Sequence, residues 1–335
     1  MKKTVLLFFL LLYIFLPVIA KNRCLLIGVG NYPDGSGWRT INSVNDVNLL
    51  EQILSKTFSV SKLIDENATH DAIIQAITSL TGEVQSGDTI LIHFSCHGQQ
   101  MLTQHKDEPD DLDESLIPYD ALSTKTKSYY GQNHLVDDEV NELVHSLRQK
   151  VGTHGLVIVT LDACFSDSMN KGDKNDGNVI YRGCYDIFGS NEVSKDSLVS
   201  LDKKKRLDND LYIERLKDCG DVVFLSACKS YQKNMETVKE GKGYGSLSYA
   251  MYLASANVGF SSIEKWIEYV KEVMGEIVYT QVPQIRSTLD LGGSSSQLQT
   301  PLNPDENKDD LNLYLYVTIF LVITIIVSII LWKKK

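Results

Sequence analysis

The sequence has few basic residues and lacks the cysteine spacings that mark zinc-binding modules. Its 335 residues include 33 Lys and Arg against 43 Asp and Glu, which gives a net charge of −10. Proteins that bind nucleic acids draw most of their affinity from Lys and Arg that neutralise phosphates, so we expect no nucleic-acid partner. The six cysteines form no CxxC pair, which argues against a zinc site. The acidic balance favours a cationic partner instead.

What the sequence does contain is the composition of a globular protein. Hydrophobic residues make up 43% of the chain and charged residues 23%, which excludes a disordered or collagen-like chain. Five of the lysines lie at the two ends, so residues 21–310 carry 28 basic and 43 acidic residues, a net charge of −15. No internal repeat is visible.

The first twenty residues have the pattern of a signal peptide. Lys2 and Lys3 precede an uncharged run from Thr4 to Ala20, whose last three residues are small or apolar. Its strongly apolar part is too short to span a bilayer comfortably and suits the hydrophobic region of a leader. We therefore expect residues 1–20 to be cleaved; an uncleaved anchor is the alternative.

The other end of the chain has the pattern of a membrane anchor. Residues 313–332 are uncharged and precede a basic tail, residues 333–335. Twenty helical residues cover a hydrocarbon core of ~30 Å, and basic tails stay on the cytoplasmic side. We expect a single-pass membrane protein with a cytoplasmic C-terminus and residues 21–310 on the outer side, where disulfides are permitted.

Between these ends, apolar runs typical of buried strands alternate with segments at helical spacing. The pattern predicts an α/β fold in which helices cover both faces of a mostly parallel central sheet. We expect one domain over residues 21–290, with polar loops at 103–134 and 167–210, and a flexible stalk over 291–312. The expected strands are 24–29, 58–64, 89–94, 156–161 and 221–226, and the expected helices are 44–54, 70–80, 138–150, 245–254 and 262–273.

Two of the expected strands end in residues that can carry chemistry. His97 follows the run 89–94, and Cys164 follows the run 156–161. Ligands of open α/β sheets bind beyond the carboxyl ends of the strands, and a thiolate nucleophile needs a base such as imidazole beside it. Either residue alone would more often be a buried thiol or a turn residue, but together they indicate a catalytic pair.

The sequence around this pair resembles a known family. The segments HFSCHG (93–98) and LDACFS (161–166) are similar to the histidine and cysteine motifs of metacaspases and bacterial caspase-like peptidases. The segment DESLIPYD (113–120) resembles a third family motif, and the order and spacing of the matches agree over roughly residues 23–290. The resemblance implies the caspase-haemoglobinase fold, with a C-terminal transmembrane helix added to it here.

The resemblance also implies roles for individual residues. Cys164 would be the nucleophile and His97 the general base and later acid, while the backbone N–H groups of Gly98 and Cys164 would form the oxyanion hole. No third member of a triad is evident. Asp46 and Asp162, with Ser95 beside them, match the residues that line the specificity pocket, and two carboxylates there favour Arg or Lys in a protein or peptide substrate.

Calcium is the metal that the resemblance suggests. Asp137 and Asp138 match a pair that coordinates calcium in some metacaspases, and hard oxygen ligands suit that ion. The alternative is that Asp137 to Glu139 form the acidic first turn of a helix. No cofactor is needed for the chemistry itself, so calcium would act only as an activator.

The loop 167–210 is where such enzymes are cut between their large and small subunits. A pocket that prefers basic residues could cut its own loop, either in the run 203–206 or at another basic position. The other candidates are Lys171, Lys174 and Arg182. Three departures from the family pattern, Cys96, Phe165 and Asp167, leave the named catalytic atoms in place.

The main interpretation is a membrane-tethered cysteine endopeptidase that cleaves after Arg or Lys through a Cys-His dyad. Two alternatives stay open. One is a legumain-like or transamidase-like enzyme of the same clan, against which the two pocket acids argue. The other is a binding scaffold without turnover, which would not need to retain both Cys164 and His97.

Overall fold

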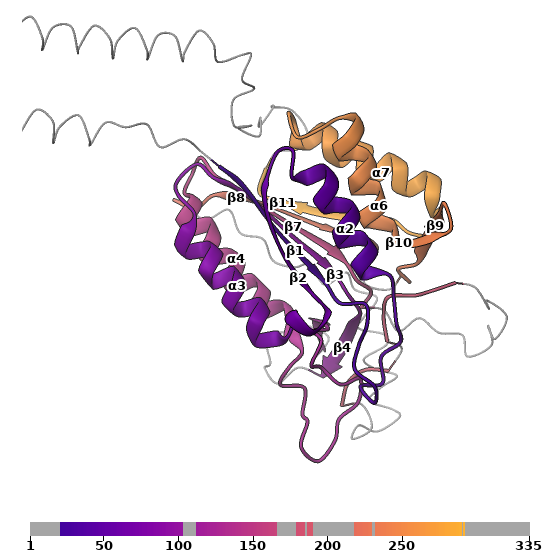
Figure 1. Cartoon of the computed structure of the whole chain (residues 1–335). Helices are drawn as coiled ribbons and strands as arrows, with labels where there is room; N and C mark the ends of the chain where they lie inside the picture. Colours follow the sequence, from indigo (N-terminus) through magenta and orange to yellow (C-terminus); the bar gives the residue numbers. More distant parts are fainter. Residues whose placement is uncertain are drawn as a thin grey trace, which may run out of the picture.

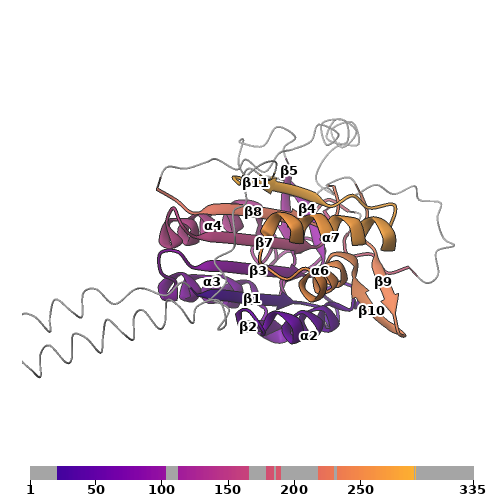
Figure 2. The same cartoon turned by 90° about the horizontal axis from the view of Figure 1, so that it is seen from above.

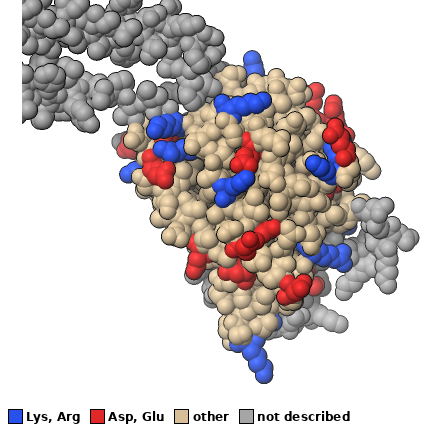
Figure 3. Space-filling model, in the orientation of Figure 1, with Lys and Arg blue, Asp and Glu red and all other residues tan. Residues whose placement is uncertain are grey.

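The computed structural model describes residues 21–102, 112–165, 179–184, 186–189, 218–229, 232–289 and 291. The expected leader, the stalk, the basic tail and most of the loop 167–210, including the run 203–206, lie outside these residues. On the face seen in Figure 3, acidic and basic side chains are interspersed over an otherwise uncharged surface, and no basic patch gathers on it.

A six-stranded sheet forms the centre of the molecule, with the strand order β11-β8-β7-β3-β1-β2. Five strands run parallel and β11 pairs antiparallel with β8. The four inner strands are buried on both faces, and their nearly continuous apolar sequences are typical of such positions. The bounds are β1 Asn22–Gly28, β2 Ser59–Ile64, β3 Thr89–Ser95, β7 Leu156–Asp162, β8 Asp221–Ser226 and β11 Gln284–Ser287.

Helices cover both faces of this sheet, as the alternation of strands and helices predicts (Figures 1 and 2). On one face lie α2 (Ser43–Leu54), α6 (Ser246–Asn257) and α7 (Ile263–Ile277). The other face is covered by α3 (His70–Glu83) and α4 (Asp137–Val151). Alternate residues of one strand enter different cores: Leu26 packs with the α2–α6–α7 side, and Leu25 with the α3–α4 side.

Several short elements were not expected from the sequence, among them the edge strand β11. A 3-10 turn, η1 (Asp65–Asn67), follows β2. A three-stranded antiparallel sheet combines β4 (Gly98–Leu102), β5 (Leu112–Leu116) and β6 (Leu135–Val136), and a hairpin joins β9 (Glu236–Lys239) to β10 (Lys242–Gly245). Since β4 begins three residues after the end of β3, the small sheet extends from the carboxyl edge of the central sheet.

The expected fold class needs one correction. It included a transmembrane helix over residues 313–332, but the part of the chain that the structure describes has no helix long and apolar enough to cross a membrane. The longest described helices, α4 and α7, have 15 residues each, fewer than the roughly 20 that a bilayer requires. Residues 313–332 themselves lie outside the described part. The fold class that the structure supports for the described residues is the α/β sheet domain.

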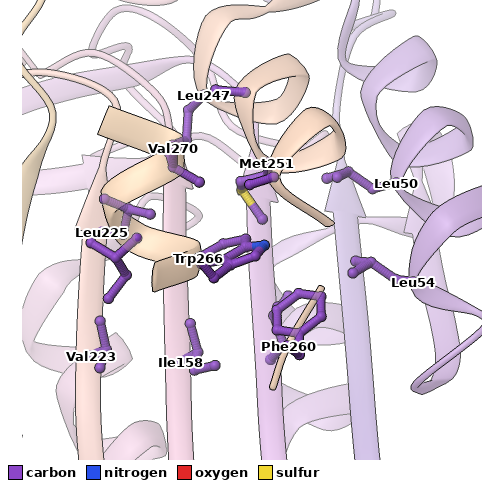
Figure 4. Close-up of a cluster of buried hydrophobic side chains, with 14 of the residues drawn as sticks. Leu50, Leu54, Ile158, Val223, Leu225, Leu247, Met251, Phe260, Trp266 and Val270 are labelled. Atoms are coloured by element: carbon purple, nitrogen blue, oxygen red, sulfur yellow. The ribbon is translucent and has the colours of Figure 1, made fainter. Parts of the chain in front are cut away.

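Trp266 of α7 is the largest fully buried side chain (Figure 4). It packs among apolar side chains of α6, α7 and the sheet, and its Nε1–H donates to Ser255 Oγ at 3.1 Å.

We expect Trp266→Ala to lower the free energy of unfolding by about 3–5 kcal/mol, because it leaves a cavity in a close-packed core. Tyr279→Ala is the matched control, since Tyr279 is 90% exposed, and should change it by less than about 0.5 kcal/mol. Urea unfolding measures both. Equal losses for the two variants would contradict the assignment of this core.

Candidate active site

The two expected catalytic residues follow neighbouring parallel strands. In the pairing of β3 with β7, Ser95 lies opposite Asp162, so His97 and Cys164 both stand two residues beyond the same register position. Both residues are buried. The carboxyl ends of β3 and β7 therefore bring the histidine and cysteine motifs to one point of the sheet edge.

Backbone N–H groups of the two motifs converge on a single oxygen atom. The N–H of Cys164 donates to the carbonyl oxygen of Arg182 at 2.9 Å, and the N–H of Gly98 donates to the same oxygen at 3.2 Å. Two N–H groups aimed at one carbonyl oxygen are the geometry of an oxyanion hole. The carbonyl that occupies this position belongs to the chain itself.

The ring of His97 is fixed by a backbone carbonyl and two aromatic rings. Its Nε2 lies 2.8 Å from the carbonyl oxygen of Arg39, and because that oxygen can only accept, Nε2 carries the proton. The ring stacks on Trp38 at 5.1 Å and lies 5.3 Å from the ring of Tyr32. Nδ1 makes no hydrogen bond to any described residue. Burial lowers the pKa of His97 to about 4, so the neutral ring offers Nδ1 as a base.

The thiol of Cys164 has a second thiol beside it. Cys164 Sγ donates to the carbonyl oxygen of Gln232 at 3.2 Å, and Cys228 Sγ donates to the same oxygen at 3.3 Å. A hydrogen bond to Cys164, together with burial, raises the pKa of Cys228, and burial raises that of Cys96 to about 12. No disulfide joins the six cysteines, all of which lie within the described residues. The neighbouring thiols therefore stay protonated near neutral pH.

Asp46, Ser95 and Asp162 surround one guanidinium group, that of Arg182. Arg182 Nη2 lies 2.7 Å from Asp46 Oδ2, and Nη1 lies 3.8 Å from Asp162 Oδ1. Nη1 also donates to Ser95 Oγ at 2.6 Å. A third carboxylate, Glu236 Oε1, lies 2.9 Å from Nη2. The side chains of Arg182 and of both aspartates are fully buried, so charge pairing must offset the cost of removing them from water.

Asp46 protonates more easily than Asp162. Its Oδ2 accepts from Ser95 Oγ at 2.7 Å and its Oδ1 from the N–H of Gly245 at 2.9 Å. Burial nevertheless raises its pKa to about 6, against the opposing effect of Arg182. Asp46 therefore titrates within the physiological pH range while it faces the guanidinium.

Asp162 is held as a charged group. Burial alone would raise its pKa, but Arg182 and hydrogen bonds from Asn234 and Ser248 hold it below the ordinary value. Asn234 Nδ2 donates at 2.7 Å, while the N–H and Oγ of Ser248 donate at 2.8 Å and 2.6 Å. The arrangement thus keeps a negative charge on Asp162, facing the guanidinium of Arg182.

Several residues of this site were missed by the sequence reasoning. Glu236 and Asn234 lie in a short polar segment with no strand pattern, and the contribution of Arg39 is a backbone carbonyl, which leaves no signal in the sequence. Gly245 is needed for space: a Cβ there would lie 2.1 Å from Asp162 Oδ2 and 2.7 Å from Arg182 Cζ. β10 can therefore approach Asp162 and Arg182 this closely only with glycine at position 245.

The chain around Arg182 crosses the site as an extended peptide. On the amino side, the N–H of Arg182 donates to the Asn234 carbonyl, and the N–H of Glu236 donates to the Ile180 carbonyl, both at 3.0 Å. On the other side, a Cβ at Gly183 would lie 3.2 Å from Cys164 Sγ. The bond between Arg182 and Gly183 therefore lies beside the thiol.

The described residues do not complete a calcium site. Asp137 and Asp138 form the acidic first turn of α4, which complements the helix dipole. No group of three or more His, Cys, Asp or Glu that could hold a metal ion occurs in the described ranges. The sequence offers Asp110, Asp111 or Asp113 as a further ligand; Asp113 lies on β5, and Asp110 and Asp111 lie outside the described residues.

Replacing Arg182 by Ala should destabilise the fold, because three carboxylates would lose their cation. In a Cys164→Ala background, which removes the expected nucleophile, we expect a loss of about 3–5 kcal/mol at pH 7. The loss should shrink at pH 5, because without the cation the carboxyl pKa values rise and the folded variant binds protons more tightly than the unfolded chain. Urea unfolding at both pH values measures it, with Arg182→Lys as the charge-preserving control. Equal stability of the Ala and Lys variants at pH 7 would contradict the role of the cluster.

Comparison with known proteins agrees with this geometry. Residues 21–291 match the family model of the caspase domain. Metacaspase-1B of Aspergillus niger is 24% identical over 314 residues, which cover 84% of this chain and 68% of that protein. Metacaspase-1 of Schizosaccharomyces pombe is 25% identical over 298 residues, covering 79% and 67%. Among solved structures, the protein GSU0716 of Geobacter sulfurreducens shares the fold, with a TM-score of 0.53, 19% identity, and coverage of 80% of this chain and 93% of its own.

The match to the caspase domain spans the central sheet, its helices and both strand-end motifs. The chain therefore belongs to the caspase-domain family and, with the metacaspases as its relatives, is a cysteine peptidase.

Proposed function

We propose that this peptidase hydrolyses peptide bonds after Arg, and less well after Lys, through the dyad Cys164 and His97, and that the Arg182–Gly183 bond of its own chain is its first substrate. The observation that carries the proposal is the position of Arg182. Its guanidinium faces Asp46, Asp162 and Glu236 while its carbonyl oxygen accepts from the two oxyanion donors. A substrate residue before a cleaved bond needs both sets of contacts at once.

In the proposed acylation step, the residues around the dyad have the following roles. His97 Nδ1 takes the proton of the Cys164 thiol, and the thiolate attacks the carbonyl carbon of the arginine. Negative charge moves to the carbonyl oxygen, where the N–H groups of Gly98 and Cys164 stabilise it. The carbonyl of Arg39 holds the imidazolium by its Nε2–H. The C–N bond breaks when Nδ1 returns the proton to the leaving amine, leaving a thioester on Cys164.

Deacylation uses the same groups in reverse order. Neutral His97 takes a proton from water, and the hydroxide attacks the thioester carbonyl. The oxyanion forms again between Gly98 and Cys164, and its collapse breaks the C–S bond. The proton on Nδ1 returns to the sulfur, so the thiol is restored and a carboxylic acid is released, which then loses its proton to the solvent.

The pocket chemistry selects a long cation. Arg182 uses Nη1 and Nη2 to reach four oxygen-bearing side chains, and this forked contact is unavailable to the single ammonium of lysine. An asparagine side chain would leave the buried carboxylates without a cation, and an aspartate would add a fourth negative charge. The proposal therefore predicts the order Arg, Lys, then the neutral and acidic residues.

Cys164→Ala should abolish cleavage between Arg182 and Gly183, because it removes the attacking sulfur. Purified wild-type chain should yield a fragment whose new N-terminus is Gly183, identified by intact mass and N-terminal sequencing, with calcium and with chelator. Cys219→Ser is the matched control, because Cys219 lies just before β8 at the amino edge of the sheet, away from the site. It should cleave at the wild-type rate.

Other outcomes of this experiment overturn parts of the proposal. A new N-terminus within residues 203–206 would move the self-cleavage to the basic run. Cleavage that persists in Cys164→Ala would mean another nucleophile. An intact wild-type chain that also leaves Arg peptides uncut would favour the scaffold interpretation.

With an Arg peptide bound at saturation, the rate should fall as the pH drops through about 6, the pKa to which burial raises Asp46 while a guanidinium faces it. Above that pH the carboxylate faces the substrate cation; below it the group is protonated and one attraction is lost. Asp46→Asn should lower kcat/KM at pH 7.5 by about thirtyfold or more, the equivalent of at least about 2 kcal/mol for a buried charge pair. It should also remove the pH limb near 6. If the rate of Asp46→Asn still falls near pH 6, another group causes the pH dependence and this prediction is wrong.

A further inference from the structure

After the Arg182–Gly183 bond, the chain lies beside β4 and forms two isolated parallel bridges with it, Gly98 with Gly183 and Met101 with Phe188. The N–H of Cys184 donates to the Gly98 carbonyl at 3.1 Å, and the N–H of Phe188 donates to the Gln100 carbonyl at 2.8 Å. In return the N–H of Leu102 donates to the Phe188 carbonyl at 3.2 Å. The segment on the leaving-group side of the bond is therefore bound along its backbone up to six residues after the bond.

Phe188 is the side-chain anchor of this segment. Among the described residues of 179–189, only the side chains of Arg182 and Phe188 are buried, one on each side of the bond. The ring of Phe188 lies 4.6 Å from that of His134 and 5.8 Å, edge to face, from that of Tyr129. The pocket also contains Met101.

The shape of this pocket depends on a glycine. Gly131 has a φ of +100°, which favours glycine. A Cβ at this position would lie 3.0 Å from Phe188 Cε1 and 3.0 Å from Met101 Cε. The loop backbone therefore touches the ring directly, and a side chain at residue 131 would narrow the pocket.

A chain of hydrogen bonds orders the wall of the pocket. Tyr129 OH donates to His134 Nδ1 at 2.9 Å, and His134 Nε2–H donates to Gln99 Oε1 at 3.0 Å. Gln99 Nε2 then donates to the carbonyl of Asp186 at 2.8 Å and to that of Ser123 at 3.1 Å. Burial lowers the pKa of His134 to about 4, which keeps the neutral ring that this direction of donation requires. The wall thus contacts the bound segment in two ways: Gln99 donates to the Asp186 carbonyl, and the ring of His134 packs against the ring of Phe188.

We propose that Gln99, Met101, Tyr129, Gly131 and His134 form a second substrate-binding site, which takes an aromatic side chain six residues after the cleaved bond. The inference rests on the proposed function and adds a substrate class to it. The substrates would be extended peptides with Arg before the cleaved bond, Gly directly after it, and Phe or another aromatic residue as the sixth residue after the bond. In the chain itself Phe188 fills this site. Arg182 and Phe188 then hold the bond from both sides, which fixes its register against Cys164.

Two peptides in trans test this site. One has the sequence of residues 179–189, and the other has Ala in place of Phe188. Full-length enzyme carrying Phe188→Ala leaves its own pocket open, so this enzyme should cleave the Phe peptide about ten- to hundredfold faster in kcat/KM than the Ala peptide, as expected for burying one aromatic side chain. Ile187→Ala in the peptide is the matched control and should have little effect.

A third peptide separates this inference from the proposed function. All peptides are added after the Phe188→Ala enzyme has cut its own Arg182–Gly183 bond, which frees the active site. A fluorogenic peptide that ends at Arg182 has no residues after the cleaved bond, so this enzyme should cut it whatever the second site contributes. If this peptide is cut but the Phe and Ala peptides are cut equally well, the second site is wrong and the proposed function stands. If the wild type cuts none of the peptides and not its own chain, the proposed function fails.

Self-cleavage supplies the corresponding test in cis. Phe188→Ala should slow the appearance of the Gly183 N-terminus about tenfold or more, and Phe188→Leu, which keeps most of the apolar volume, should give an intermediate rate. The Leu variant also serves if the Ala variant fails to fold, as judged by the third peptide. Wild-type rates of self-cleavage in folded Ala and Leu variants would overturn the inference.

Discussion

The ion cluster around Arg182 is the constraint on which the site depends. A buried guanidinium must be paired, and it finds its partners on three separate elements: Asp46 on α2, Asp162 at the end of β7 and Glu236 on β9. The same residue places its carbonyl between the N–H groups of Gly98 and Cys164. One residue of a polar loop therefore connects the helix layer, the central sheet and the small hairpin, and it does so through the groups that would bind a substrate.

The parts of the fold that could be predicted are those in which local sequence and final environment agree. β3 and β7 are buried on both faces, and their unbroken apolar runs show this directly. β4 pairs with β5, and β9 pairs with β10; because these strands are short and mostly polar, no apolar strand pattern marks them in the sequence. The expected membrane helix had an apolar run in its favour, but the described structure contains no helix of that kind.

The candidate site shows the same division. His97 and Cys164 could be proposed because each follows a strand within a recognisable motif, and the acids Asp46 and Asp162 came with the resemblance. Groups that act through the backbone, such as the Arg39 carbonyl, could not be predicted, because a carbonyl is present at every residue. Arg182 was only one of several basic candidates in its loop, because nothing in the local sequence shows that its side chain becomes fully buried.

The segment around Arg182 changes its pairing partner at the Arg182–Gly183 peptide bond. Before the bond, Ile180 and Arg182 pair with residues 234–236; after it, Cys184 and Phe188 pair with β4. The bond is thus a covalent tether between the hairpin region and the three-stranded sheet, and it gives each half a high effective concentration for its own groove. Once the Arg182–Gly183 bond is cut, each half is still joined to its own fragment but no longer to the other half, so the pairing with residues 234–236 and the pairing with β4 can open independently of each other.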